Sequence, residues 1–125
     1  MKNIPKISDA ELAVMKVLWE QSPLTANGVI DILGAETDWN HRTIRTLLAR
    51  LVKKGALATE QQGREYLFSP LVTQEQVFQA ERQTFLQRLY NGSVLPMLTA
   101  FLEEEDLSEQ EIGKLKEILN RREET

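Results

Sequence analysis

The residues from Trp39 to Gly55, WNHRTIRTLLARLVKKG, constrain the fold more than any other part of the chain. Asn40 is a good helix N-cap, because its side chain can accept a hydrogen bond from a free backbone N–H in the first turn, and Gly55 suits the helix end. Apolar residues recur here at helical spacing, which predicts one buried stripe. The stripe consists of Ile44, Leu47, Leu48, Leu51 and Val52.

The other side of this predicted helix carries cations and small residues and no carboxylate. A solvated helix surface usually mixes both signs of charge, because stabilising ion pairs one turn apart need both. A surface of a single sign therefore favours a polyanionic partner.

Two short helices are predicted before this one. Ser8 and Glu11 form a capping-box pattern at the start of a helix that runs to about residue 21. Thr25 can cap a second helix, Ala26 to Leu33, and Gly34 fits its C-terminal end.

Strand signals flank these helices. Leu24 is a candidate for a very short strand, and residues 56–61 and 64–69 can each form a strand with Gln62-Gly63 as the hairpin turn. Pro70 stops the last strand, because it cannot donate to the ladder. The order of elements is that of a winged helix, whose third helix docks in the DNA major groove while the hairpin rests on the backbone.

This arrangement assigns candidate DNA contacts by position. Early residues of a recognition helix reach base edges, where Arg pairs with guanine and Thr offers a hydroxyl or a methyl group. Later cations contact phosphate, which adds affinity without sequence choice. We expect base contacts from Arg42, Thr43, Arg45 and Thr46, and phosphate contacts from Arg50, Lys53, Lys54 and, on the hairpin, Arg64.

The charge distribution agrees with a basic N-terminal part. The net charge is −4, but residues 1–72 hold 9 basic and 8 acidic residues, whereas residues 73–125 hold 6 and 11. The chain contains no cysteine and one histidine, so disulfides, thiolate sites and a transition-metal centre are not expected. No nucleophile–base set or paired carboxylates indicate an enzyme. No apolar run suits a signal peptide or membrane insertion, and we expect a cytoplasmic protein without cofactors.

The C-terminal half predicts three helices, at 73–90, 94–102 and about 112–119, with an acidic loop at 103–106. They are too short and too apolar to form a core alone, and an exposed apolar surface usually marks an interface. We therefore expect a DNA-binding domain at 1–72 and a dimerisation domain at 73–125; the alternative is that these helices pack back on the winged helix. The predicted interface residues are Phe78, Phe85, Leu89, Leu98, Phe101, Leu102, Ile112, Leu115 and Leu119.

Four separated segments resemble the penicillinase repressor family of the BlaI/MecI type. They are ISDAELAVMKVLWE, TIRTLLARLVKKGAL, FLQRLYNG and AFLEEEDLSEQEI. The resemblance runs from about Ile7 to the end. It implies a homodimeric winged-helix repressor that binds dyad operators ahead of β-lactamase or methicillin-resistance genes. A related branch of copper-responsive repressors carries a C-terminal cysteine motif, which this chain lacks.

The resemblance also implies a mode of release. Repressors of this type are inactivated by proteolysis in the dimerisation domain when a membrane sensor-transducer detects a β-lactam. The family's scissile bond is Asn–Phe, and the matching pair here is Ala100–Phe101, so the Phe is kept and the Asn is not. Two alternatives remain: release by a non-proteolytic signal, and a winged-helix module that binds proteins instead of DNA.

Overall fold

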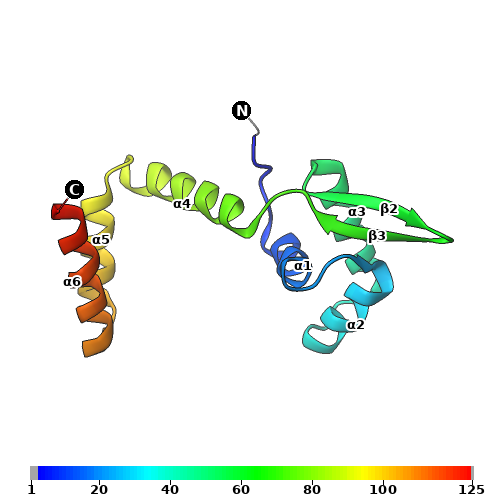
Figure 1. Ribbon diagram of the computed structural model, residues 1–125, viewed down its shortest axis with the longest axis horizontal. Coiled ribbons are helices and arrows are strands. Elements are labelled where there is room, and N and C mark those ends of the chain that lie inside the picture. The colour runs from blue at the N-terminus through cyan, green and yellow to red at the C-terminus, as the bar shows by residue number, and fades with distance from the viewer. Residues whose placement is uncertain (1–2, 125) are drawn as a thin grey trace. The chain divides into compact units, whose positions relative to one another are not determined.

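The computed structural model describes residues 3–124, and its elements follow one another along the chain as Figure 1 shows. They are α1 (Asp9–Glu20), β1 (Leu24–Thr25), α2 (Ala26–Glu36), α3 (His41–Lys54), β2 (Leu57–Gln62), β3 (Glu65–Pro70), α4 (Gln74–Tyr90), α5 (Val94–Glu104) and α6 (Glu109–Glu123). This is the mainly helical fold with a small β-hairpin that the sequence predicts. The chain forms two compact units that divide between Arg82 and Gln83.

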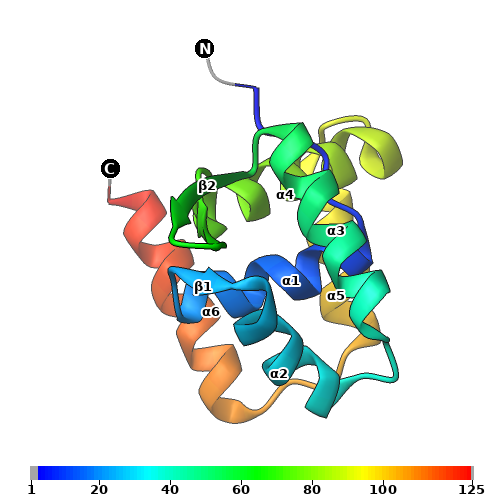
Figure 2. The ribbon, with the colours of Figure 1, turned by 90° about the vertical axis from the view of Figure 1, so that its right-hand side faces the viewer.

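The first unit is a winged helix whose core lies between α1, α2 and α3, with the three helices packed on one another (Figure 2). Each helix contributes fully buried apolar side chains, because each has an apolar stripe that must leave water. The buried set includes Val14, Met15 and Leu18 from α1, Val29 and Leu33 from α2, and Ile44, Leu48 and Leu51 from α3.

The predicted helix caps are confirmed. The Ser8 hydroxyl accepts a hydrogen bond from the Glu11 N–H at 3.2 Å, and the Glu11 carboxylate accepts one from the Ser8 N–H at 2.9 Å. The side chain of Asn40 caps α3 by accepting from the Thr43 N–H at 2.9 Å. Gly55 ends α3 with φ of 83°, a left-handed conformation that glycine adopts without steric cost.

The predicted end of α2 is wrong. The helix continues past Gly34 to Glu36, and a Cβ built on Gly34 would meet nothing within 4 Å. Thr37 ends the helix instead, since its backbone N–H and its hydroxyl both donate to the Leu33 carbonyl oxygen at 2.8 Å. Gly34 lacks the positive φ that a glycine C-cap uses, so the helix continues through it.

The three strands form one antiparallel sheet in the order β1-β3-β2. Gln62 pairs with Glu65, so the hairpin turn consists of Gly63 and Arg64 and not of the predicted Gln62-Gly63. Gly63 has φ of 65°, and a positive φ at the first of two turn residues is what a type II′ turn requires. Both strands begin and end one residue later than predicted, and Arg64 lies at the hairpin tip.

The start of α4 belongs to the first unit. Val77 is 1% exposed, and the ring of Phe78 meets Trp19 edge-on at 6.1 Å between centroids. These contacts tie the first turns of α4 to the core of the first compact unit, which ends at Arg82.

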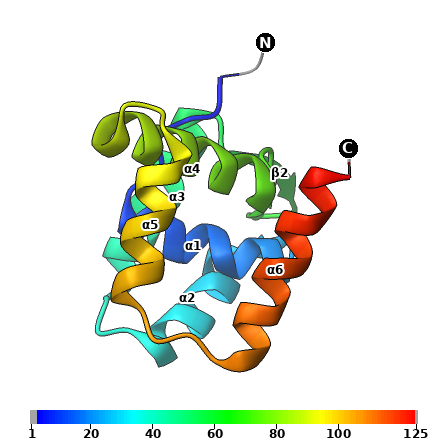
Figure 3. The same ribbon diagram turned by 90° about the vertical axis from the view of Figure 1, so that its left-hand side faces the viewer.

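The second unit contains the rest of α4 and the helices α5 and α6. Figure 3 shows α5 and α6 joined by their loop and diverging from it. Glu103 and Glu104 continue α5, so the predicted acidic loop is shorter, and α6 extends to Glu123. A second capping box, between Ser108 and Glu111, starts α6 as predicted.

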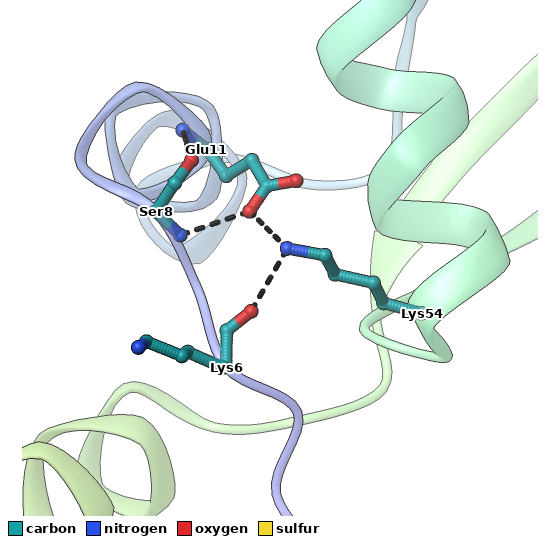
Figure 4. A network of polar contacts seen from close by, with 4 residues as sticks. All are labelled: Lys6, Ser8, Glu11 and Lys54. Atoms are coloured by element: carbon teal, nitrogen blue, oxygen red, sulfur yellow. Dashed lines mark hydrogen bonds and ion pairs between the residues drawn. The ribbon is translucent and has the colours of Figure 1, made fainter.

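An ion pair between the buried carboxylate of Glu11 and the partly exposed ammonium of Lys54 joins the start of α1 to the end of α3 (Figure 4). The Glu11 side chain is 2% exposed, and its carboxylate accepts from the Lys54 ammonium, which also donates to the Lys6 carbonyl oxygen at 2.9 Å. Burial raises the pKa of Glu11, but the hydrogen bonds from Lys54 and Ser8 outweigh it and hold the pKa below its ordinary value.

This lowered pKa makes the stability of the first unit depend on pH. A carboxylate whose pKa is lower in the folded state contributes stability that is fully present above its unfolded pKa, ~4.3 for Glu, and is lost as the pH falls through the folded value. We expect Glu11→Gln to reduce the loss of stability between pH 7 and pH 3. Urea unfolding followed by tryptophan fluorescence measures this, since both tryptophans, Trp19 and Trp39, lie in the first unit.

The matched control is Glu20→Gln, which neutralises an exposed carboxylate at the end of the same helix. It should leave the pH dependence close to that of the unaltered chain. We expect Lys54→Met to cost about 2–3 kcal/mol at pH 7, because it leaves the Glu11 charge buried without its cation. An unchanged pH dependence in Glu11→Gln would contradict this account of the ion pair.

Candidate nucleic-acid interface

The helix α3 has one side in the core and the other in solvent. Its buried residues are Ile44, Leu47, Leu48 and Leu51, and its exposed residues include Arg42, Arg45, Thr46, Arg50 and Lys53. Thr43 is half-buried in the first turn, where its N–H donates to Asn40. Since α3 contains no acidic residue, its solvent side carries positive charge alone.

These cations remain free of carboxylates within the structure. Among residues 3–124, no ion pair joins Arg42, Arg50, Lys53 or Arg64 to an acidic side chain. An unpaired, solvated cation can exchange its counterions for a phosphate, which is the main source of affinity for DNA. Four of the predicted contact residues are therefore available to a polyanion.

Lys54 differs from these four cations, because its ammonium is bonded to other groups of the chain. Its ammonium is held between the Glu11 carboxylate and the Lys6 carbonyl oxygen. Periodicity along α3 does not reveal this pair, because Glu11 lies 43 residues earlier in the chain.

Arg45 is held by a residue that the pattern of the sequence does not predict. One of its terminal nitrogens, Nη2, donates to the side-chain oxygen of Asn27 at 2.9 Å. Asn27 is the second residue of α2 and lies 18 residues before Arg45. An isolated Asn on a helix carries no sequence signal for this contact.

The hairpin brings a cation and an aromatic ring to the same region. Arg64 lies in the turn, and Tyr66, which is 52% exposed, follows it on β3. A hollow of about 200 Å³ is lined by residues from the start of α2, from α3, from the hairpin turn and from β3, among them Asn27, Arg45, Arg64 and Tyr66. Tyr66 was not predicted as a DNA contact. The alternation of apolar and polar residues along a strand indicates which side of the sheet a residue lies on, but not which molecule it contacts.

The predicted interface residues lie in both units. Phe78 lies in the first unit against Trp19, whereas the other predicted residues belong to the second unit. Phe85 stacks on Phe101 at 6.2 Å between centroids. Most of the others are well exposed, namely Leu89, Leu98, Phe101, Leu102, Ile112 and Leu119, and Leu115 is half-buried.

The Ala100–Phe101 bond lies inside α5, three residues before the end of the helix at Glu104. Ala100 is half-buried, and Phe101 is 46% exposed. Cutting here separates most of α5 from Phe101 and from all of α6.

The part of the chain that the structure describes contains no group of three or more His, Cys, Asp or Glu side chains placed to hold a metal ion. None of its helices combines the length and the apolar character needed to cross a bilayer.

The chain is similar to known repressors over nearly its whole length. The penicillinase repressor of Bacillus licheniformis is 44% identical over 119 residues, which cover 95% of this chain and 93% of that protein. The methicillin resistance regulatory protein MecI of Staphylococcus aureus is 33% identical over 117 residues, which cover 94% of this chain and 95% of that protein. Both relatives are regulators and not enzymes by description.

Solved structures match the winged-helix part. The DNA-binding domain of the repressor BlaI is 47% identical with a TM-score of 0.54, over 59% of this chain and 90% of that one. The monomeric form of Bacillus licheniformis BlaI, solved in complex with the blaP half-operator, is 47% identical with a TM-score of 0.53, over 60% of this chain and 92% of that one. The model of the penicillinase repressor family matches residues 7–121, and the chain therefore belongs to that family.

Proposed function

We propose that this chain is a transcriptional repressor that binds dyad operator DNA as a homodimer and controls β-lactamase or related antibiotic-resistance genes. The observation that carries the proposal is the solvent side of α3. It exposes the cations Arg42, Arg45, Arg50 and Lys53 and no carboxylate, opposite the apolar stripe that packs in the core. The solved complex of the related BlaI with a half-operator supports it.

The position of each residue along α3 determines whether it contacts bases or phosphates. Arg42, Thr43, Arg45 and Thr46 lie in its first two turns and read base edges. Arg50, Lys53 and the hairpin residue Arg64 contact phosphates and set affinity.

This division predicts two kinds of variant. Arg42→Ala or Arg45→Ala should reduce discrimination between operator and unrelated duplex by about 10- to 100-fold, because a base contact is worth ~1–3 kcal/mol. Arg50→Ala or Lys53→Ala should weaken binding to both duplexes alike and lower the slope of log K against log salt by ~1. Fluorescence anisotropy at several salt concentrations measures both quantities.

Lys116→Ala is the control, because it removes an exposed cation from α6 in the other unit. It should leave both the discrimination and the salt slope unchanged. Equal losses on operator and unrelated DNA for Arg42→Ala and Arg45→Ala would contradict base reading by α3, and a chain that protects no dyad in footprinting would contradict the proposed function.

The homodimer is proposed from the second unit. None of the residues of α5 and α6 is buried, although these helices carry the apolar side chains Leu98, Phe101, Leu102, Ile112 and Leu119. Apolar side chains exposed together are usually covered by a partner. A second copy is the partner that suits an operator dyad, since two recognition helices then meet two half-sites about one helical turn, ~34 Å, apart.

A pair of variants in one turn of α6 tests the dimer. Leu119→Asp places a carboxylate on the apolar side of the helix, whereas Asn120→Asp places one on the next residue, outside the apolar set. We expect Leu119→Asp to raise the dimer dissociation constant about tenfold or more, because ~1.4 kcal/mol of lost burial is tenfold. Sedimentation equilibrium measures it, and equal effects of the two variants would argue against a dimer through this surface.

We further propose release by proteolysis between Ala100 and Phe101, driven by a membrane sensor-transducer. A cut there removes Phe101 and α6 from the proposed interface. Two joined half-sites bind far more tightly than one, so loss of dimerisation costs most of the operator affinity.

Cells exposed to a β-lactam should therefore convert the chain into a fragment of about residues 1–100, and mass spectrometry of the purified repressor incubated with such an extract detects it. We expect Phe101→Ala to slow the cut by about tenfold or more, as a pocket built for an aromatic ring loses ~1–3 kcal/mol of contact. Full derepression with an intact chain would instead favour a non-proteolytic signal.

A further inference from the structure

We propose that Asn27 is a positioning residue that holds the Arg45 guanidinium in one orientation and thereby sharpens base selection by α3. The inference rests on the proposed DNA binding and adds a residue outside the recognition helix. It begins from the 2.9 Å hydrogen bond between Arg45 Nη2 and the Asn27 side-chain oxygen.

The chemistry of the two groups fixes which atoms meet. A guanidinium has five N–H donors and no acceptor, so Asn27 must present its oxygen and not its NH2 group. One donor of Arg45 is thus used, and the others remain available. A bidentate contact to guanine O6 and N7 needs two of them, so the bond to Asn27 still permits base reading.

The support for Arg45 comes from a rigid element. Asn27 is the second residue of α2, whose N-terminus is fixed by the Thr25 hydroxyl, which accepts from the Gly28 N–H at 3.1 Å. Behind it, Val29, Ile30 and Leu33 seat α2 in the core. The oxygen that holds Arg45 is therefore anchored on a helix and not on a loop.

The bond is poorly placed to stabilise the fold. Both Asn27 and Arg45 are exposed, and a hydrogen bond that water can replace contributes little to the free energy of unfolding. The hydrogen bond instead restricts the conformation of the long Arg45 side chain. A free Arg samples many rotamers, and ordering it opposes binding, whereas a side chain already held can select one base.

The surroundings place this pair where DNA contacts are expected. Asn27 and Arg45 line the same hollow as Arg64 and Tyr66 of the hairpin. The guanidinium is thus held at the junction of α2, α3 and β3, beside the cation of the hairpin tip.

The test uses the full-length chain and a pool of random duplexes from which bound sequences are selected and sequenced. The base pair whose preference disappears in Arg45→Ala is the one that Arg45 reads. We expect Asn27→Ala to reduce the preference at that base pair by about three- to tenfold, while preferences at other positions persist.

The variant Asn27→Asp distinguishes the positioning of Arg45 from the effect of charge at residue 27. It keeps an acceptor oxygen for Arg45 but adds a negative charge near the phosphates, so the preference at the Arg45 position should persist while overall affinity falls. A merely structural role for Asn27 would not produce these opposite patterns in the Ala and Asp variants.

A double-mutant cycle tests whether Asn27 influences base preference through Arg45. If Asn27 acts through Arg45, adding Asn27→Ala to Arg45→Ala changes the preferences no further. Additive effects would show that Asn27 contacts DNA itself and would overturn the proposal, as would full discrimination in Asn27→Ala. Failure of the unaltered chain to select any sequence is a different outcome, because it removes the proposed function as well.

Discussion

The burial of one side of α3 is the interaction on which the rest of the first unit depends. Ile44, Leu48 and Leu51 are at most 1% exposed, and they fix the rotation of α3 about its own axis. Because helical residues three and four apart share a side, this rotation places Arg42 and Arg45 in solvent without any further interaction. Packing of the apolar stripe in the core therefore also determines that the cations on the other side of α3 face solvent.

In the second unit, the apolar side chains of α5 and α6 do not pack into a buried core. Its helices α5 and α6 have no buried residue, yet leucines and isoleucines recur along them and α5 also carries Phe101. Helices of this length are marginal alone in water, because propensity contributes less than tertiary packing. In the proposed homodimer, a second copy would bury these apolar side chains and join two winged-helix units.

Much of the fold was predictable, because its signals are local. The caps at Ser8, Asn40 and Ser108 depend on residues within one turn, and all three are confirmed. The end of α2 was not predictable from Gly34, because a glycine ends a helix only where the backbone takes a positive φ, and the turn shifted by one residue because strand pairing sets the register. The assignments of DNA and interface residues remain predictions.

Helical periodicity in the sequence already shows that α3 has an apolar side and a side whose charges are all positive, because residues three and four apart lie on the same side of a helix. Which of these cations are free depends on contacts with other elements of the fold. Lys54 is taken by Glu11 and Arg45 is held by Asn27, partners 43 and 18 residues away. Such pairs depend on how α3 crosses α1 and α2, and crossing geometry arises from side-chain packing between helices, which the spacing of residues along one helix does not encode.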